Sequence, residues 1–309
     1  MGLTLDSAVC NACPRRCGVP RGRGFCGSQP RVASVCVHRG EEPPLNPIVN
    51  IFFTGCNLQC IYCQNWQISR SRDASGRYGL TDSSAMSVDA IVDEVCRQHA
   101  VLGGGDTFLL GFVTAAHCPA VVPAVVEALR RRGLQPTVVY NSSGYESVDT
   151  LRSLEGLVDI YLPDLKYKDP ALADAYSHAP DYPEVAEAAI MEMQRQVGAS
   201  LKVDDDGMAY RGMLVRHLVL PGALDNTRRC LQWLADTMPP SVALSVMAQY
   251  FPPRPGLPAP LDRTLLADEY DEALRIVDTL GFFNVYTQQL DARDNYRPDF
   301  SRQGHPFEK

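Results

Sequence analysis

From Pro47 onward, short runs of apolar residues alternate with amphipathic stretches of helical length. This alternation is the pattern of repeated β–α units, in which helices join the strands of a parallel sheet. Six apolar runs predict strands: Ile48–Thr54, Thr107–Val113, Pro136–Asn141, Val158–Leu162, Met213–Leu220 and Ala243–Met247. A further run, Phe282–Tyr286, predicts either one more strand or a segment that closes the edge of the sheet.

Helices are expected between these strands. Val88–Leu102 and Glu184–Val197 each place apolar side chains near one helical face, and Leu265–Leu280 follows the sixth strand. Arg130–Arg132 ends another helix-like stretch, where positive charge complements the helix dipole. Six β–α repeats predict an α/β fold built as a partial (β/α)6 barrel. Active sites in such sheets collect at the carboxyl ends of the strands.

Composition separates the start of the chain from the rest. Residues 1–46 are rich in Cys, Gly, Pro and Arg with little periodicity, which predicts a small cysteine-rich metal-binding module. The barrel is expected over residues 47–290, and residues 291–309 form a polar tail. The 309 residues are 45% hydrophobic and 21% charged, so the chain can form a sizeable core.

Charge and hydropathy bear on whether nucleic acid or a membrane is a partner. The net charge is −7 and no stripe of Lys and Arg stands out, so a nucleic-acid partner is not expected. The N-terminus lacks the charged and apolar regions of a signal peptide, and no uninterrupted apolar segment reaches the roughly 18 residues of a membrane span. We therefore expect a cytoplasmic protein with no membrane partner.

Cysteines supply the candidate chemistry. The chain has 11 of them, many for a compartment in which thiols stay reduced. Four are isolated and are interpreted as small buried hydrophobic residues. The others fall into two clusters, which points to metal binding: Cys10, Cys13, Cys17 and Cys26, then Cys56, Cys60 and Cys63.

The second cluster follows the first predicted strand with the spacing C-x3-C-x2-C. Three thiolates can hold three irons of a 4Fe–4S cubane and leave the fourth iron open to a ligand such as S-adenosylmethionine (SAM). The alternatives are a zinc knot and three unrelated core cysteines. Zinc sites usually have four ligands, and three close cysteines after a strand are improbable by chance.

This motif closely resembles the signature of the radical SAM superfamily. Other segments resemble the branch of pyruvate formate-lyase activating enzyme-like proteins, in the right order along the chain. They are Cys10–Gly18, Tyr140–Tyr145, Asp159–Lys166, Val215–Gly222 and Met247–Tyr250. The resemblance implies reductive cleavage of SAM to a 5′-deoxyadenosyl radical, which abstracts hydrogen from a substrate. It also implies an electron donor such as flavodoxin or ferredoxin.

The resemblance assigns SAM-contacting roles near the strand ends. Asp164 and Lys166 match an Asp-x-Lys that contacts SAM and helps to form a cation site, and Arg216 is placed near the SAM carboxylate. Asn141 stands where activating enzymes have an acidic cation ligand, so that cation site is weaker or absent here. An ordinary turn over 141–144 and a strand-end salt bridge remain the alternatives.

Other expected cofactor contacts rest on the same resemblance. The family's Gly-Gly-Glu motif is not found after the second strand, and Thr114 and His117 are the candidates there. His217 should point to the opposite face of its strand from Arg216, as a packing residue. The remaining expected contacts to SAM or substrate are Tyr62, Asn65, Ser143 and Gln249.

The N-terminal cysteines have the spacing C-x2-C-x3-C-x8-C. Four thiolates suit either structural zinc or an auxiliary iron–sulfur cluster, and we expect a structural role. Glu41 and Glu42 follow, and a solvated acidic turn is the favoured interpretation of that pair.

Within the radical SAM class, the chain resembles activases that make a glycyl radical on a partner protein. The first alternative is an enzyme that tailors a peptide or small molecule, including one that forms an aminocarboxypropyl radical by cleaving a different C–S bond. A non-catalytic iron–sulfur or zinc scaffold is the alternative from another class. The sequence does not choose the substrate.

Overall fold

The apolar runs form the centre of one mixed sheet in the computed structural model, which describes residues 9–20, 23–27, 31–69, 87–295, 297–302 and 305–307. The strand order is β1-β2-β3-β4-β5-β7-β8-β9, with β6 paired to β7 beside this path. The strands are β1 (Val32–His38), β2 (Ile48–Phe53), β3 (Thr107–Val113), β4 (Gln135–Ser142), β5 (Ile160–Pro163), β6 (Lys202–Val203), β7 (Ala209–Leu218), β8 (Ala243–Met247) and β9 (Val285–Thr287).

From β2 to β9, each neighbouring pair along this path is parallel. All six predicted strands are present as β2, β3, β4, β5, β7 and β8, and the run at 282–286 contributes β9 at the edge. The protein is therefore a mixed α/β fold with a largely parallel central sheet.

Strand β1 was not predicted. It lies within the region assigned to the cysteine-rich module, yet it pairs antiparallel with β2 from Val32 opposite Phe53 to His38 opposite Ile48. The C-terminal tail also contacts this edge, because the rings of Phe300 and Phe307 pack edge-on and tilted against Phe52, with centroids 5.4 and 5.8 Å away. Both ends of the chain thus contribute to the sheet and its packing.

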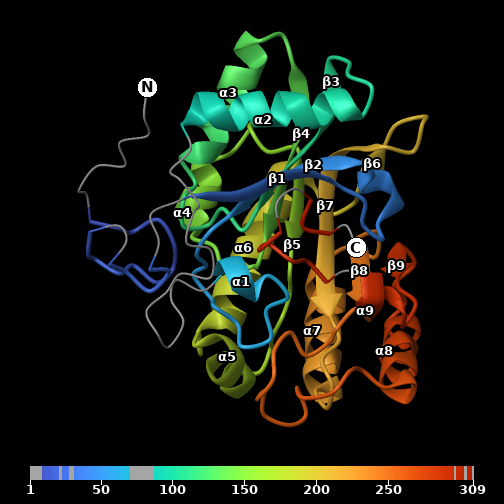
Figure 1. Ribbon diagram of the computed structural model, residues 1–309. Helices are drawn as coiled ribbons and strands as arrows, with labels where there is room; N and C mark the ends of the chain where they lie inside the picture. Colours follow the sequence, from blue (N-terminus) through green and yellow to red (C-terminus); the bar gives the residue numbers. More distant parts are fainter. Residues whose placement is uncertain are drawn as a thin grey trace.

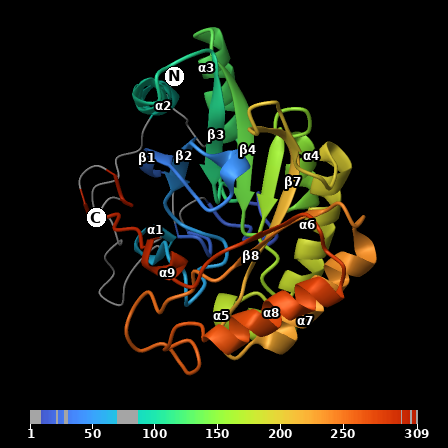
Figure 2. The ribbon, with the colours of Figure 1, turned by 90° about the vertical axis from the view of Figure 1, so that its right-hand side faces the viewer.

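Helices cover the outer side of the sheet, and α6, α7 and α8 run along the strands β7 and β8 (Figures 1 and 2). Ser87 caps α2 by accepting a hydrogen bond from the Ala90 amide, and the three predicted helices are found as α2, α6 and α8. The helices are α1 (Trp66–Ser69), α2 (Val88–Val101), α3 (Val121–Arg131), α4 (Val148–Ser153), α5 (Pro170–Ser177), α6 (Tyr182–Val197), α7 (Leu224–Thr237), α8 (Ala267–Thr279) and α9 (Ala292–Asn295), with a 3-10 turn at Pro43–Leu45.

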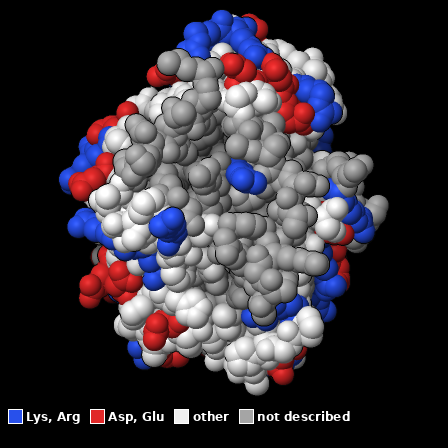
Figure 3. Space-filling model, turned by 60° about the vertical axis from the view of Figure 1, so that its left-hand side comes forward, with Lys and Arg blue, Asp and Glu red and all other residues white. Residues whose placement is uncertain are grey.

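The largest apolar core lies between these helices and the sheet. It joins strand residues such as Val49, Phe112 and Val215 to helix residues such as Val125 and Leu231. Among the residues that the structure describes, no helix combines the length and apolar character needed to span a bilayer. On the face shown in Figure 3, acidic and basic side chains are interspersed.

Candidate active site

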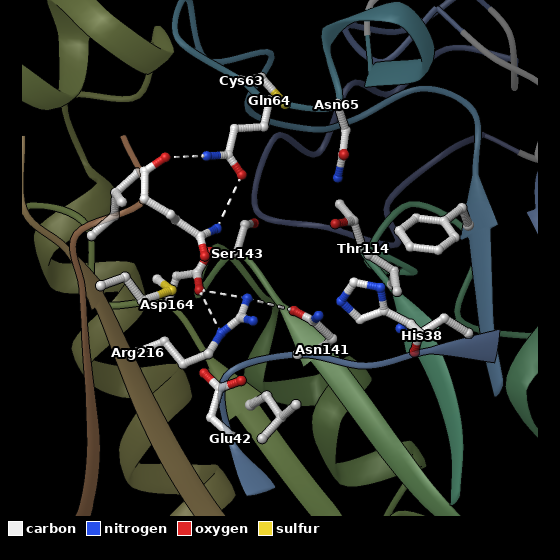
Figure 4. Close-up of a pocket in the computed structure, with 18 of the residues that line it drawn as sticks. His38, Glu42, Cys63, Gln64, Asn65, Thr114, Asn141, Ser143, Asp164 and Arg216 are labelled. Carbon is white, nitrogen blue, oxygen red and sulfur yellow. Dashed lines mark hydrogen bonds and ion pairs between the residues drawn. The ribbon is translucent and has the colours of Figure 1, made fainter. Parts of the chain in front are cut away.

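A cavity of about 240 Å³ lies inside the curve of the sheet, and every strand of the parallel set from β2 to β8 contributes to its wall. Cys63 lies at one end of the cavity and Glu42 at the other, with Arg216 and Asn141 between them (Figure 4). Of the site residues expected from the sequence, the cavity wall contains Cys56, Cys60, Tyr62, Cys63, Asn65, Thr114, Asn141, Ser143, Asp164, Lys166, Arg216 and Gln249.

The loop after β2 carries the three cysteines of the C-x3-C-x2-C motif. The chain turns at Gly55, whose φ of 81° lies in the left-handed region that favours glycine. Burial and the neighbouring thiols of Cys60 and Cys63 raise the pKa of Cys56 to about 12. Burial and Cys60 also raise the pKa of Cys63. Buried thiols this close together become thiolates only when a positive charge, such as a metal, compensates them.

Hydrogen-bond donors point at these sulfur atoms. The Leu58 amide donates to Cys56 Sγ at 3.4 Å, and Ser177 Oγ donates to Cys60 Sγ at 3.0 Å. Ser177 is fully buried at the end of α5. Donors aimed at sulfur stabilise thiolate, so the loop suits metal-bound cysteine.

Behind Ser177, a chain of buried hydroxyl groups continues to the cavity. Tyr167 shares a hydrogen bond of 2.8 Å with Ser177, and its hydroxyl donates to the Tyr62 hydroxyl at 2.7 Å. Tyr62 precedes the last cysteine of the motif and lines the cavity. The cysteine loop is therefore connected to α5 by a continuous polar network.

Across the cavity from the cysteines, a charged group is built at the ends of β5 and β7. Lys166 Nζ lies 2.6 Å from Asp164 Oδ2, and Arg216 donates to Asp164 Oδ1 from Nε at 3.1 Å and from NH2 at 2.9 Å. Arg216 NH2 also donates to Asn141 Oδ1 at 2.9 Å. Burial alone would raise the pKa of Asp164, but Lys166 and Arg216 outweigh it and lower that pKa. The carboxylate therefore stays ionised and fixes both cations.

Amide side chains form another wall of the cavity. Gln249 donates from Nε2 to Gln64 Oε1 at 3.0 Å and accepts from Gln288 Nε2 at 2.8 Å. Ser143 is buried in the wall, and its hydroxyl has no hydrogen-bond partner among the described residues. Gln249 and Ser143 therefore belong to a polar part of the wall.

His117 lies elsewhere. It was expected to contact SAM, but it is not part of the cavity wall, and its Nε2 pairs with the Thr54 carbonyl at 2.9 Å. The chain turns at Thr114, with a φ of 58°, and the following Ala115 and Ala116 are fully buried. This turn directs Thr114 to the cavity and carries His117 behind the cysteine loop.

His217 is a packing residue, as predicted. Its ring nitrogens pair with the Leu165 carbonyl at 2.7 Å and with Thr227 Oγ1 at 3.0 Å, on the helix side of β7. Burial lowers its pKa to about 4. His217 is therefore neutral at physiological pH and positions α7 against the sheet.

The N-terminal cysteines lie next to the cysteine loop. Burial raises the pKa of Cys13 to about 11, and its thiol contacts the side chain of Asn57, the residue after Cys56. Cys17 Sγ accepts from the Phe25 amide at 3.4 Å. Within the described part of the chain, no three His, Cys, Asp or Glu side chains are grouped closely enough to hold a single metal ion. The four N-terminal cysteines are not joined in disulfides, and a metal on them stays a prediction.

Arg15 attaches this N-terminal segment to the domain. Its Nε donates to the Asn57 carbonyl at 2.9 Å, NH2 donates to the Ser177 carbonyl at 3.1 Å, and NH1 donates to the His178 carbonyl. The guanidinium also lies 3.9 Å from the ring centroid of Phe25. Arg15 therefore joins the N-terminal cysteines to both the cysteine loop and α5.

Several polar residues of the cavity were missed from the sequence, among them Glu42 and Asn50. Glu42, interpreted as part of a solvated turn, lines the cavity and accepts from Ser245 Oγ at 2.8 Å. Asn50 lines the cavity from within β2 and is only 6% exposed. The signal for Asn50 was available, because it interrupts the apolar run over residues 48–53 of a predicted strand.

No model of a known protein family matches the chain. Two relatives are uncharacterized proteins of Methanocaldococcus jannaschii. One is 27% identical over 286 residues, which cover 90% of this chain and 76% of the relative. The other is 32% identical over 87 residues, which cover 22% of this chain and 26% of the relative.

One solved structure with a similar arrangement is a radical SAM methyltransferase from Sphaerobacter thermophilus. The TM-score is 0.49 and the identity 13%, over 78% of this chain and 66% of that one, so the chain spans just under two thirds of its length. Because the two curated relatives are uncharacterized, the function has to be argued from the site itself.

Proposed function

We propose that this protein is a radical SAM enzyme that holds a 4Fe–4S cluster on Cys56, Cys60 and Cys63. The observation that carries the proposal is that the three thiols of the motif share one cavity with the charged group around Asp164 and Arg216. Three thiolates leave one iron of a cubane without a protein ligand, which is the arrangement that SAM binding requires.

The residues present fit such a cluster. The three thiols interact electrostatically, Cys56 and Cys60 are buried, and an amide and a hydroxyl donate to the sulfur atoms of these two. The thiolates of a cubane bind different irons, so they lie farther apart than the ligands of a single ion. When bound there and reduced, the cluster supplies the electron that cleaves SAM to methionine and a 5′-deoxyadenosyl radical.

In this proposal, the protein's own residues orient SAM. Lys166 and Arg216 are the cations that pair with its carboxylate, and Asp164 accepts from its amino group. Both cations are held by Asp164 within 3.1 Å, so they are positioned before SAM binds. Asn141 occupies the place of an acidic cation ligand and instead accepts from Arg216, which favours a weak or absent cation site.

Other lining residues complete the binding site. Tyr62, Thr114 and Gln249 are proposed contacts to the adenosine or the substrate, and Ser143 offers its unpaired hydroxyl. The six β–α repeats that surround the cavity form the proposed partial (β/α)6 barrel. The N-terminal cysteines are proposed as a second, structural metal site of zinc or iron–sulfur type.

The reaction we propose is hydrogen abstraction from a substrate, as in the activases of glycyl-radical enzymes. A protein or peptide substrate and a cytoplasmic electron donor of the flavodoxin or ferredoxin type belong to the same proposal. The resemblance of the segments at 140–145, 159–166 and 215–222 to activating enzymes supports it.

Product analysis tests the proposed function. Anaerobically reconstituted protein should, after dithionite reduction, convert SAM to methionine and 5′-deoxyadenosine, measured by mass spectrometry. Cys63→Ala should abolish this cleavage, whereas Cys118→Ala, a buried thiol outside the motif, should retain it. Lys166→Ala should weaken SAM binding tenfold to a hundredfold, because losing a charge-assisted bond costs about 1.5–3 kcal/mol.

The products also discriminate between the alternatives. Methylthioadenosine as the main product would replace the deoxyadenosyl route with the aminocarboxypropyl route. An intact cluster without any cleavage of SAM, even with candidate substrates present, would contradict the enzyme assignment and leave an iron–sulfur scaffold.

A further inference from the structure

Three buried hydroxyl groups lead from the end of β5 to a sulfur atom of the cysteine loop. Ser177 Oγ lies 3.0 Å from Cys60 Sγ, the Tyr167 hydroxyl lies 2.8 Å from Ser177 Oγ, and the Tyr62 hydroxyl lies 2.7 Å from that of Tyr167. We call the hydroxyl groups of Ser177, Tyr167 and Tyr62 the hydroxyl chain. All three residues and Cys60 are buried, so these contacts are made in a medium in which hydrogen bonds are stronger than in water.

Aromatic packing holds the two phenols of the hydroxyl chain in place. The Tyr62 ring meets the rings of Tyr176 and Tyr250 edge-on, with centroids 6.2 Å away in both cases. The Tyr167 ring meets that of Tyr182 edge-on at 5.2 Å. The positions of the phenols therefore depend on their rings, and removing a single hydroxyl should leave the rings where they are.

The number of protons determines the direction of the hydrogen bonds. Each hydroxyl group has one proton to donate. Ser177 donates its proton to Cys60 Sγ, and an iron-bound cysteine is a thiolate that only accepts. Ser177 then needs the proton of Tyr167, and Tyr167 needs that of Tyr62. All three contacts are hydrogen bonds only when every proton points toward the sulfur.

Tyr167 is the member of the hydroxyl chain with two possible acceptors. Its hydroxyl donates to Tyr62 in the structure and also lies within hydrogen-bond distance of Ser177. Donation to Tyr62 leaves the contact with Ser177 without a proton whenever Ser177 donates to Cys60. A thiolate at Cys60 therefore favours donation from Tyr167 to Ser177. Burial raises the pKa of the Tyr167 phenol well above its usual range, so the phenol keeps this proton.

Donation from Tyr167 affects the sulfur through Ser177. A hydroxyl that accepts one hydrogen bond is polarised and makes its own bond stronger, by roughly 10–30%. Without that donor, the Ser177 proton is free to turn to a carbonyl in the preceding turn of α5, as helical serines commonly do. The hydrogen bond to Cys60 therefore depends on a phenol that does not touch the sulfur.

We propose that Tyr167 is a positioning residue for the cluster, because it donates to Ser177, directs the Ser177 proton to Cys60 Sγ and thereby raises the reduction potential of the cluster. The proposal rests on the proposed function, since it requires an iron-bound thiolate at Cys60. A donor to such a thiolate stabilises the reduced, more negative state. Tyr167 directly follows Lys166, so the hydroxyl chain also joins the proposed carboxylate-binding group to the cysteine loop.

Redox titrations of the anaerobically reconstituted full chain, followed by electron paramagnetic resonance, test the proposal. At the wild-type midpoint, the ratio of reduced to oxidised cluster should fall roughly fivefold to tenfold in Ser177→Ala and by a smaller factor in Tyr167→Phe. The double variant should match Ser177→Ala, because Tyr167 acts through Ser177 alone. Tyr161→Phe is the matched control, since its buried hydroxyl donates to Gln196 at 2.8 Å, outside the hydroxyl chain.

Iron content and absorbance show whether each variant holds its cluster. If Tyr167→Phe does not, Tyr62→Phe takes its place and should lower the potential by less than Ser177→Ala does. An unchanged potential in the phenylalanine variant, or shifts that add in the double variant, overturns the proposal. Wild-type protein that binds no cluster refutes the proposed function, whereas a cluster whose potential is independent of Tyr167 refutes only the positioning role.

Discussion

At the scale of single residues, the hydrogen bond from Ser177 to Cys60 Sγ has a measurable consequence. Its length is 3.0 Å, and both groups are buried. A donor to a cluster-bound thiolate stabilises the reduced, more negative state and so raises the reduction potential of the cluster. Within the proposed function, Ser177 is a positioning residue that adjusts how easily the cluster is reduced.

We expect Ser177→Ala to lower the midpoint potential of the cluster. A hydrogen bond worth about 1–1.5 kcal/mol corresponds to roughly 40–60 mV for one electron. A redox titration followed by electron paramagnetic resonance measures the shift. Ser153→Ala, whose hydroxyl bonds only its own helix at the Thr150 carbonyl, is the control. A potential that stays unchanged in Ser177→Ala would contradict this role.

Glu146 is a buried carboxyl group whose protonation makes stability depend on pH. It is 2% exposed and accepts hydrogen bonds from Ser142 Oγ at 2.7 Å and from the Tyr140 hydroxyl at 3.4 Å. Burial raises its pKa to about 7, and these two hydrogen bonds offset only part of that rise. Between about pH 4.5 and pH 7 the folded chain keeps a proton that the unfolded chain releases.

The contribution of protonated Glu146 to the free energy of unfolding should therefore be fully present below about pH 4.5. It should be lost as the pH rises to about 7. The shift of about 2.5 units corresponds to roughly 3 kcal/mol. Urea unfolding of wild type and Glu146→Gln at pH 5 and pH 8 measures it, and the variant should gain stability relative to wild type at the higher pH. If the free energies of unfolding of the two proteins differ by the same amount at both pH values, the pKa of Glu146 is not raised.

At the scale of elements, the N-terminal cysteine segment is attached through few contacts. Arg15 makes three hydrogen bonds to the carbonyls of Asn57, Ser177 and His178. Gln59 Nε2 adds one bond of 2.6 Å to the Phe25 carbonyl, and Thr150 Oγ1 adds one of 2.7 Å to the Ala12 carbonyl. Arg15 therefore makes three of these five hydrogen bonds.

Arg15→Gln should release the segment, at a cost of about 1.5–3 kcal/mol in docking free energy. The expected results are a lower melting temperature and faster thermolysin cleavage near the N-terminus. Arg16→Gln is a closely matched control, because Arg16 makes no side-chain hydrogen bond or ion pair within the described residues. Equal cleavage rates for the two variants would show that Arg15 is dispensable.

At the scale of the whole molecule, the two sets of cysteines are neighbours in space but belong to different segments of the chain. The side chain of Asn57 contacts Cys13 on one side and lies 4.0 Å from Cys56 Sγ on the other. The motif cysteines are carried by the loop after β2, whereas the N-terminal cysteines precede β1. The proposed sites can therefore be emptied one at a time.

A triple variant, Cys56→Ala/Cys60→Ala/Cys63→Ala, should lose about four irons and the charge-transfer absorbance of the cluster. It should keep the metal of the N-terminal cysteines, if they bind one. Metal analysis and absorbance after anaerobic reconstitution measure both. Unchanged iron in the triple variant would contradict the assignment of the cluster to the motif.

The sequence by itself determined the features that depend on near neighbours in the chain. The six central strands and three of the helices follow from apolar periodicity, which is a local property. Asp164, Lys166 and Arg216 were also expected in one site, because the resemblance to activating enzymes assigns all three to SAM, and their places at strand ends agree with that. The spacing of Cys56, Cys60 and Cys63 needs only one loop.

The tertiary structure alone decided which distant loops meet. His117 was assigned by its place after a strand, but the turn at Thr114 and the buried Ala115 carry it behind the cavity. Glu42 has the sequence of a solvated turn, yet β1 pairs with β2 and brings its loop beneath the cavity, where Ser245 fixes it from 203 residues away. Such contacts depend on how the whole sheet curves and packs, and no pattern of neighbouring residues encodes them.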